Sequence, residues 1–174
     1  MNAAGETPFR LVPLGKEHDR QNFTCRVESL DSYLKTQAGQ DMRRKANAVC
    51  VLVTEERPEE VAGYFTLCAT SLAPGGIPET ARRHLPRYPL VSATLLGRLA
   101  VAREWQGRGI GSRLLTMALE KSLQNAGIVG SSMVVVDALD ERAARFYGQH
   151  GFIRLRSSMR LVMPMRTIAK LIGG

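Results

Sequence analysis

The chain has 174 residues, of which 44% are hydrophobic and 23% are charged. This length and composition are those of one folded globular domain with a full core, and they exclude a disordered chain. The formal net charge is +8, from 24 basic and 16 acidic residues, which favours polyanionic partners such as nucleic acids, phosphorylated cofactors or acidic protein segments.

The cellular setting predicted from the sequence is the reducing cytoplasm. No apolar stretch approaches the ~20 residues of a membrane-spanning helix, and residues 1–10 lack the basic and apolar regions of a signal peptide. Cys25, Cys50 and Cys68 are odd in number and widely spaced, which favours reduced thiols over disulfides or a zinc site. The three histidines are His18, His84 and His150. They show no metal-ligand spacing, so we interpret them as surface or loop residues and expect no metal.

The first part of the chain predicts a strand, a helix and a hairpin. Residues 9–14 form the first strand, and residues 47–54 and 61–73 form hairpin strands separated by a charged turn. A helix over residues 30–46 begins at Ser29 as its N-cap. Apolar residues recur along this helix at helical spacing: Leu30, Leu34, Ala38 and Met42.

The middle of the chain predicts a proline-rich connection, a strand and a long helix. Residues 74–92 carry four prolines and one or two helical turns at "ARRHL". Residues 93–102 show little polar alternation, so this strand is expected to be buried on both faces. A helix follows from Gly109 to Ala126, with one apolar stripe: Ile110, Leu114, Ala118 and Leu119.

The last part of the chain predicts a strand over residues 132–139, a helix capped by Asp140 that ends at Gly151, and one or two strands over residues 152–165. The order β-α-β-β followed by β-α-β-α-β indicates a mixed α/β sheet. We expect one domain over residues 1–165 and a tail over residues 166–174 that either packs on the domain or hangs free.

A glycine-rich loop, Gln106-Gly107-Arg108-Gly109-Ile110-Gly111, follows a strand and opens a helix. A helix N-terminus carries free N–H groups and the positive end of the helix dipole, and glycine lets an anion approach the backbone closely. Arg108 and Arg113 add positive charge, so the loop predicts a phosphate site. A P-loop would need a lysine here, and a dinucleotide loop would need G-x-G-x-x-G in a first βαβ unit, so neither fits.

The pattern Q-x-x-G-x-G, followed by "ARFYGQHGF" at residues 144–152, resembles the GNAT superfamily of N-acyltransferases. The resemblance implies an α/β (α+β) fold with a mixed, mostly antiparallel sheet flanked by helices, and acetyl-CoA as co-substrate. It implies that backbone amides around Leu99 and Val101 bind the pantetheine and the thioester oxygen, and that Tyr147 lies next to the thiol of CoA. The cofactor-binding residues implied in this way are Leu99, Ala100, Val101, Gln106, Gly107, Arg108, Gly109, Ile110, Gly111 and Ser112.

A narrower resemblance is carried by "LGRLAVAREWQGRGIGSRLL" at residues 96–115 and by "LDSYL" at residues 30–34, which a basic stretch follows. From about Phe23 to about Leu161 the chain is similar to the acetyltransferase toxins of bacterial type II toxin–antitoxin systems. This resemblance implies acetylation of the α-amino group of aminoacyl-tRNA, a block of translation, and neutralisation by an antitoxin with a ribbon-helix-helix part. It also implies a homodimer, as is common among such toxins.

The residues of the strand agree with an α-amino substrate. A lysine amine with a pKa of about 10.4 needs a general base at neutral pH, whereas an α-amino group with a pKa of about 7.7–8.0 is already partly neutral. Residues 94–102 contain Arg98 and no carboxylate, and Glu104 remains an alternative base acting through water. Tyr147 is the expected proton donor to the thiolate, and the alternative is a packing tyrosine beside Phe146.

Three basic segments suit tRNA phosphates or an acidic antitoxin tail. The first is Arg43-Arg44-Lys45, which we assign to substrate binding together with Arg98. The second runs from Arg82 to Arg87, and the third places three arginines on one face of a strand: Arg154, Arg156 and Arg160.

Three alternatives stay open at this stage. Asp137, at the end of a strand, contacts substrate or caps the next turn. The enzyme is a metabolic or resistance-type N-acetyltransferase acting on a small-molecule amine. Alternatively, the chain is a basic binding module that keeps the CoA site but does not catalyse a reaction.

Overall fold

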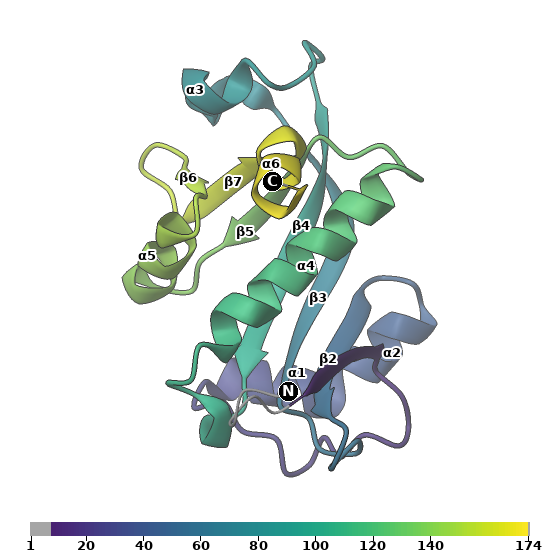
Figure 1. Ribbon diagram of the computed structural model, residues 1–174. Helices are drawn as coiled ribbons and strands as arrows, with labels where there is room; N and C mark the ends of the chain where they lie inside the picture. Colours follow the sequence, from purple (N-terminus) through teal and green to yellow (C-terminus); the bar gives the residue numbers. More distant parts are fainter. Residues whose placement is uncertain (1–7, 174) are drawn as a thin grey trace. The chain divides into compact units, whose positions relative to one another are not determined.

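The computed structural model describes residues 8–173, which contain a seven-stranded sheet, six α-helices and two 3-10 helices (Figure 1). The strand order is β1-β2-β3-β4-β5-β7-β6. Strands β4 and β5 pair in parallel, whereas β1 with β2, β5 with β7 and β6 with β7 pair antiparallel. The predicted mixed, mostly antiparallel sheet with flanking helices is therefore confirmed.

The chain forms two compact units, residues 8–66 with 98–114, and residues 67–97 with 115–173. Three elements run through both units: β3 (Gly63–Leu72), β4 (Val91–Val101) and α4 (Ile110–Ala126). The other elements of unit 1 are β1 (Phe9–Pro13), α1 (Glu28–Thr36), α2 (Ala38–Arg43), β2 (Ala48–Thr54) and the 3-10 helix η2 (Arg103–Trp105). Those of unit 2 are η1 (Pro74–Gly76), α3 (Glu79–Arg82), β5 (Met133–Asp137), α5 (Glu141–Gln149), β6 (Ile153–Arg154), β7 (Arg160–Pro164) and α6 (Met165–Gly173).

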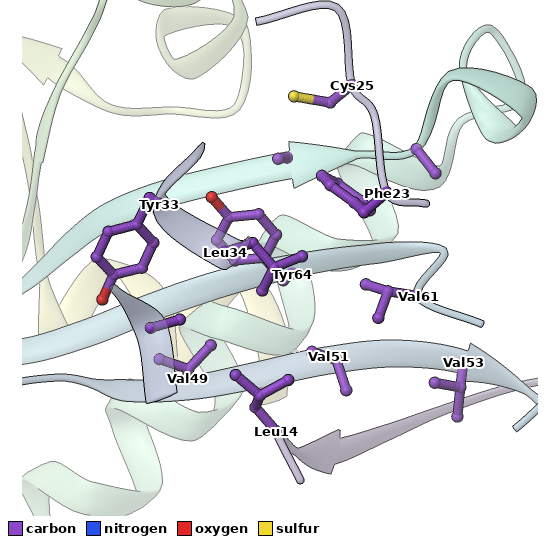
Figure 2. Packing of buried hydrophobic residues seen from close by; sticks show 13 residues of the cluster. Leu14, Phe23, Cys25, Tyr33, Leu34, Val49, Val51, Val53, Val61 and Tyr64 are labelled. Atoms are coloured by element: carbon purple, nitrogen blue, oxygen red, sulfur yellow. The ribbon is translucent and has the colours of Figure 1, made fainter. Parts of the chain in front are cut away.

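The core of unit 1 lies where the apolar stripe of α1 and α2 meets one face of the sheet. Alternate residues of β2 enter this core, as the two-residue period of a strand requires: Val49, Val51 and Val53. Tyr33 and Leu34 of α1 pack against Tyr64 of β3 (Figure 2), and the hydroxyl of Tyr64 donates to the carbonyl of Leu30 at 2.6 Å. The predicted helical stripe is therefore the packing face.

Two details of the first helix were predicted wrongly. Residues 30–46 do not form one helix, because the chain breaks at Gln37, whose φ is −120°, and continues as α2. Ser29 is not the N-cap, because α1 begins at Glu28 after Val27 and has no side-chain cap. The carboxylate of Asp31 instead accepts hydrogen bonds from the segment that enters α1, from Cys25 N at 2.8 Å and from Thr24 Oγ1 at 3.1 Å.

Strand β4 is less buried than predicted. Its pairing with β5 joins residues 94–96 to residues 134–136, and Gly97, beyond this ladder, is exposed. Leu99 and Val101 are half-buried, so the expectation of burial on both faces fails in the second half of β4. The first four residues of β5 are fully buried, as expected.

Unit 2 has its own core, formed by the first half of β4, by β5 and β7, and by the segment around α3. Helices α5 and α6 pack against β7 (Figure 1). Ile168 of α6 is fully buried, so residues 166–173 pack on this unit rather than hang free. The division into a domain over residues 1–165 and a tail stays a prediction, and residue 174 lies outside the described residues. Of the helices between residues 8 and 173, none has the length and apolar character to cross a bilayer.

Candidate active site

The glycine-rich loop has the backbone that its sequence predicts. Gly107 and Gly109 have φ of +76° and +75°, a left-handed conformation that costs other residues about 1–2 kcal/mol. A Cβ built on either glycine would meet no heavy atom within 4 Å, so the backbone conformation, and not packing, requires glycine here. Residues 106–109 are exposed and Ile110, the first residue of α4, is buried. The loop therefore offers bare backbone at a helix N-terminus, which suits an anion.

Gln106 has a role that the sequence did not reveal. Its side-chain Nε2 donates to the carbonyl of Val101 at the end of β4, at 3.0 Å, and to the carbonyl of Cys25 before α1, at 2.8 Å. Its backbone N–H donates to the carbonyl of Arg103 at 3.3 Å. The residue therefore links the loop to β4 and to the segment that enters α1. Contact of Gln106 with a cofactor remains a prediction.

Two aromatic rings position the arginines of the loop. The guanidinium of Arg108 lies 5.0 Å from the ring centroid of Trp105, and that of Arg113 lies 5.0 Å from the ring centroid of Phe9. The two rings meet edge to face at 5.1 Å. Neither Phe9 nor Trp105 was predicted to belong to the site, although Trp105 directly precedes the loop. Cation–π contacts keep both charges beside the loop, where they would attract phosphate.

The backbone of Leu99, Ala100 and Val101 forms the end of β4, beyond the three residue pairs of the β4–β5 ladder. On the other side, Gly63 of β3 lies so close that a Cβ there would be 2.9 Å from the carbonyl oxygen of Ala100. This position therefore requires glycine. Binding of pantetheine along Leu99–Val101 stays a prediction.

Arg98 lies over an aromatic ring beside α1. Its guanidinium is 3.5 Å from the ring centroid of Tyr33, whose hydroxyl donates to the Asp41 carboxylate at 2.8 Å. The same carboxylate accepts from Gln37 Nε2 and Asn47 Nδ2, both at 3.0 Å. These hydrogen bonds, that from Gln37 first, lower the pKa of Asp41, so it is ionised at neutral pH.

Arg43, Arg44 and Lys45 are exposed at the end of α2, as expected of residues that contact a large anion. A Cβ on Gly39 would lie 2.8 Å from Arg20 Nη1 and 3.4 Å from Arg43 Nη1. Arg20, distant in sequence, therefore joins this group of cations. No sequence pattern connected Arg20 with α2.

Tyr147 lies on α5 of unit 2, and its helix is built as predicted. Asp140 caps α5 by accepting from Ala143 N at 2.8 Å, and Gly151 has a φ of +98° just after the helix. The Tyr147 ring is buried and packs edge to face against two neighbours. Its ring centroid lies 5.2 Å from that of Phe146 and 5.5 Å from that of Phe152. Burial raises the pKa of Tyr147 to about 12, so the phenol keeps its proton at neutral pH.

Two forked ion pairs hold the chain on both sides of Asp140. Asp137 accepts from Arg160 Nε and Nη2 at 2.7 and 2.9 Å, and Glu141 accepts from the two terminal nitrogens of Arg154 at 2.9 and 2.8 Å. The prediction of three arginines on one strand face is wrong, because residues 155–159 turn the chain between β6 and β7. The carboxylate of Asp137 is occupied by Arg160, and Asp140 is the residue that caps the helix.

The histidines and cysteines do not form a metal-binding cluster within residues 8–173. His18 lies in the loop between β1 and α1, as predicted, but it is buried, and its Nδ1 accepts from Gly15 N at 2.9 Å. Between residues 8 and 173, no group of three or more His, Cys, Asp or Glu side chains is placed to hold a metal ion. None of the three cysteines forms a disulfide within the described chain, and burial raises the pKa of the Cys25 thiol to about 12.

Comparison with known proteins agrees with this geometry. Residues 47–154 match the family model of the acetyltransferase (GNAT) domain. The tRNA-acetylating toxin of Mycobacterium tuberculosis is 33% identical over 156 residues, which cover 89% of this chain and 91% of that protein. AtaT complexed with acetyl-methionyl-tRNAfMet has a TM-score of 0.86 and 29% identity, covering 95% of this chain and 99% of that one.

A second structure of AtaT, a tyrosine-to-phenylalanine mutant bound to the C-terminus of the antitoxin AtaR and to acetyl-CoA, has a TM-score of 0.80 and 27% identity. It covers 95% of this chain and 99% of that one. The family match spans more than half of the chain and includes β4, the glycine-rich loop and α5. The chain therefore belongs to the GNAT family of acetyltransferases.

Proposed function

We propose that this chain is a toxin that transfers the acetyl group of acetyl-CoA to the α-amino group of aminoacyl-tRNA and so blocks translation. The observation that carries the proposal is the extent of the likeness to a tRNA-acetylating toxin, nine-tenths of both chains. A likeness of this length cannot come from the acyl-CoA loop alone. The proposed place of action is the cytoplasm, where aminoacyl-tRNA is used.

Acetyl-CoA would supply an activated acetyl group as a thioester. The exposed amides of the loop and the guanidinium groups of Arg108 and Arg113 would bind its phosphates, which is consistent with the two left-handed glycines at the start of α4. Backbone amides of Leu99 and Val101 would bind the thioester oxygen. Donors aimed at a developing oxyanion typically contribute about 3 kcal/mol each.

The acceptor amine must be neutral when its nitrogen forms the bond to the acetyl carbon. The second half of β4 has no carboxylate that could take a proton from a lysine-type ammonium. An α-amino group, with a pKa of about 7.7–8.0, is partly neutral without such a base. The residues of β4 therefore support an aminoacyl acceptor.

Tyr147 would donate its phenolic proton to the CoA sulfur as the C–S bond breaks, the new amide would lose its extra proton to solvent, and the Tyr147 phenolate would regain a proton from solvent. A phenol whose pKa is raised by burial is fully protonated at neutral pH, as a proton donor must be. Removal of this one hydroxyl would leave the ring to pack against Phe146 and Phe152.

The partners follow from charge and likeness. The exposed cations of α2, Arg43 and Arg44 with Lys45, would contact tRNA phosphates. We also propose that a ribbon-helix-helix antitoxin neutralises this chain, since a structural neighbour binds the C-terminus of its antitoxin. Homodimerisation is proposed by analogy with other toxins of this kind.

The test compares wild type with Tyr147→Phe, and uses Tyr88→Phe as a control because Tyr88 is an exposed tyrosine of the same unit. Wild type and Tyr88→Phe, expressed without antitoxin, should arrest growth and acetylate pooled aminoacyl-tRNA in vitro. Tyr147→Phe should acetylate about 10²–10⁴-fold more slowly, the usual contribution of general acid catalysis, and still bind acetyl-CoA. A harmless wild type that acetylates only free small amines would contradict the proposed function.

A further inference from the structure

Arg98 is a fixed and incompletely neutralised positive charge beside the predicted acceptor position. It precedes Leu99 on β4 and is half-buried, with its guanidinium 3.5 Å above the Tyr33 ring. Among residues 8–173, no carboxylate oxygen lies within 4.0 Å of a guanidinium nitrogen of Arg98, the distance that defines an ion pair. The stack on Tyr33 therefore holds the charge in place without cancelling it.

Three titratable groups face Arg98 from the elements packed around it: Tyr33 of α1, Asp41 of α2 and Tyr64 of β3. Burial raises the pKa of both tyrosines, so they are neutral across the physiological range. Asp41 is ionised, but its carboxylate already accepts hydrogen bonds from Tyr33, Gln37 and Asn47. Asp41 therefore weakens the field of Arg98 without forming an ion pair with it.

We propose that Arg98 is a specificity-determining residue that selects neutral α-amino groups and rejects cationic amines by electrostatic repulsion. The inference rests on the proposed function, because it places the acceptor amine next to the thioester expected at Leu99. A nearby fixed cation disfavours the ammonium form of the acceptor, so it increases the neutral and reactive fraction. The same charge repels lysine side chains and polyamines, which stay protonated. Arg98 would thus do by electrostatics part of what a general base does in other enzymes.

The size of the effect follows from Coulomb's law. A unit charge about 7 Å from an amine shifts its pKa down by about half a unit in a water-like dielectric, and further in a drier site. For an α-amino group this shift makes the neutral fraction at pH 7 about two- to threefold larger. For a lysine-type amine with a pKa of about 10.4, less than 1% is neutral at that pH with or without the shift.

The experiment measures kcat, with saturating substrate, from pH 5.5 to 8.5, because the pH dependence of kcat reports the pKa of the acceptor amine in the enzyme–substrate complex. The substrate is an amide-linked aminoacyl-tRNA, whose aminoacyl bond survives at high pH. Arg98→Gln and Arg98→Met remove the charge, Arg98→Lys keeps it, and Arg10→Gln removes an exposed charge of β1 as the matched control. A rise in Tm on addition of acetyl-CoA identifies folded protein for each variant. Spermidine, offered to the same variants, measures the rejection of cationic amines.

We expect the acidic limb of the pH profile of kcat to move up by about half a pH unit or more in Arg98→Gln and Arg98→Met, because the bound acceptor ammonium then loses its proton less readily. Arg98→Lys and Arg10→Gln should keep the wild-type limb, and the ratio of spermidine to aminoacyl-tRNA acetylation should rise in the two neutral variants alone.

If the wild type acetylates aminoacyl-tRNA, two results would overturn the inference about Arg98 and leave the proposed function standing. The first is an acidic limb of the pH profile that stays at the wild-type pH in both Arg98→Gln and Arg98→Met. The second is a rate that falls equally at every pH with a shallower salt dependence, which would identify Arg98 as a phosphate contact. A wild type without activity on aminoacyl-tRNA would overturn the proposed function, and the inference with it.

Discussion

Replacement of Gln106 tests how the glycine-rich loop is held to the rest of unit 1. In Gln106→Ala, two hydrogen bonds from the side-chain amide disappear, one to the carbonyl of Val101 and one to the carbonyl of Cys25. The Val101 bond is exposed, so water can replace it at little cost. The Cys25 bond is partly buried, and a buried acceptor left without a donor costs about 1–3 kcal/mol.

The free energy of unfolding of Gln106→Ala should therefore fall by about 1–2 kcal/mol, nearly all of it from the Cys25 carbonyl. For a protein of this size, such a loss lowers Tm by about 2–8 °C. It remains small beside the total stability of about 5–15 kcal/mol, so the variant stays folded. Urea unfolding followed by tyrosine and tryptophan fluorescence measures it, with Gln124→Ala, an exposed glutamine of α4, as the control.

Gln106→Glu sharpens the test, because it exchanges the donor for an acceptor of almost the same shape. Two carbonyl oxygens then face the introduced carboxylate, which raises its folded-state pKa above the unfolded value of about 4.3. The protonated acid can still donate to one carbonyl. The contribution of the protonated Gln106→Glu side chain to the free energy of unfolding is therefore fully present below about pH 4. It is lost as pH rises through the folded-state pKa.

The stability difference between Gln106→Glu and Gln106→Ala should thus grow in favour of alanine from about pH 4 to 6, within the window of a raised carboxyl pKa. Comparison of the two variants at each pH removes the acid sensitivity common to the whole protein. Equal stability of wild type and Gln106→Glu at pH 7 would refute the reasoning, because it would mean that the amide makes neither bond.

Three further predictions concern the loop and the cations of α2. Gly109→Ala should lower the free energy of unfolding by about 1–2 kcal/mol through its positive φ alone, and an unchanged urea midpoint would count against this backbone. Gly109→Glu should also abolish the rise in Tm that acetyl-CoA produces, whereas a preserved rise would remove the phosphate assignment. Reversal of Arg43, Arg44 and Lys45 to glutamate should slow acetylation of aminoacyl-tRNA and flatten its salt dependence, with acetyl-CoA binding intact. An unaltered rate at low salt would mean that these residues do not touch tRNA.

The parts of the fold that local patterns specify were predicted well. The loop follows a strand and opens α4 because glycines at positions 107 and 109 permit a left-handed backbone and Ile110 begins an apolar stripe. Helix α5 begins at Asp140 because its carboxylate accepts from a free amide of the first turn. In both cases, residues within one or two turns of each other determine the conformation.

The errors arise where distant residues decide. The first helix packs on Tyr64 of β3, whose hydroxyl donates to the carbonyl of Leu30, 34 residues away, and such a contact leaves no periodic signal for the break at Gln37. The arginines at positions 154 and 160 alternate in sequence but belong to different strands. Each pairs with a carboxylate that precedes it by more than ten residues.

For the candidate site, the sequence predicted the backbone of the glycine-rich loop and the helix that carries Tyr147, because these motifs are local, and the roles of Tyr147 and of the basic residues stay predictions. It did not reveal the aromatic supports of the arginines or the bonds of Gln106. Those depend on chain segments far apart in sequence, such as Phe9 with Arg113, and only the folded backbone brings them together.

The burial of α6 bears on the genetics of this protein. Its Ile168 side chain is fully buried in unit 2, and Leu171 lies about 4.0 Å from the position of a Cβ on Gly151, the turn that follows the helix of Tyr147. Under the proposed toxin function, nonsense and frameshift mutations as late as codon 168 would remove Ile168 and uncover this apolar surface, and so allow a cell to escape the toxin. The target for inactivating mutations thus extends through codon 168, far beyond the codons of the acetyl-CoA loop.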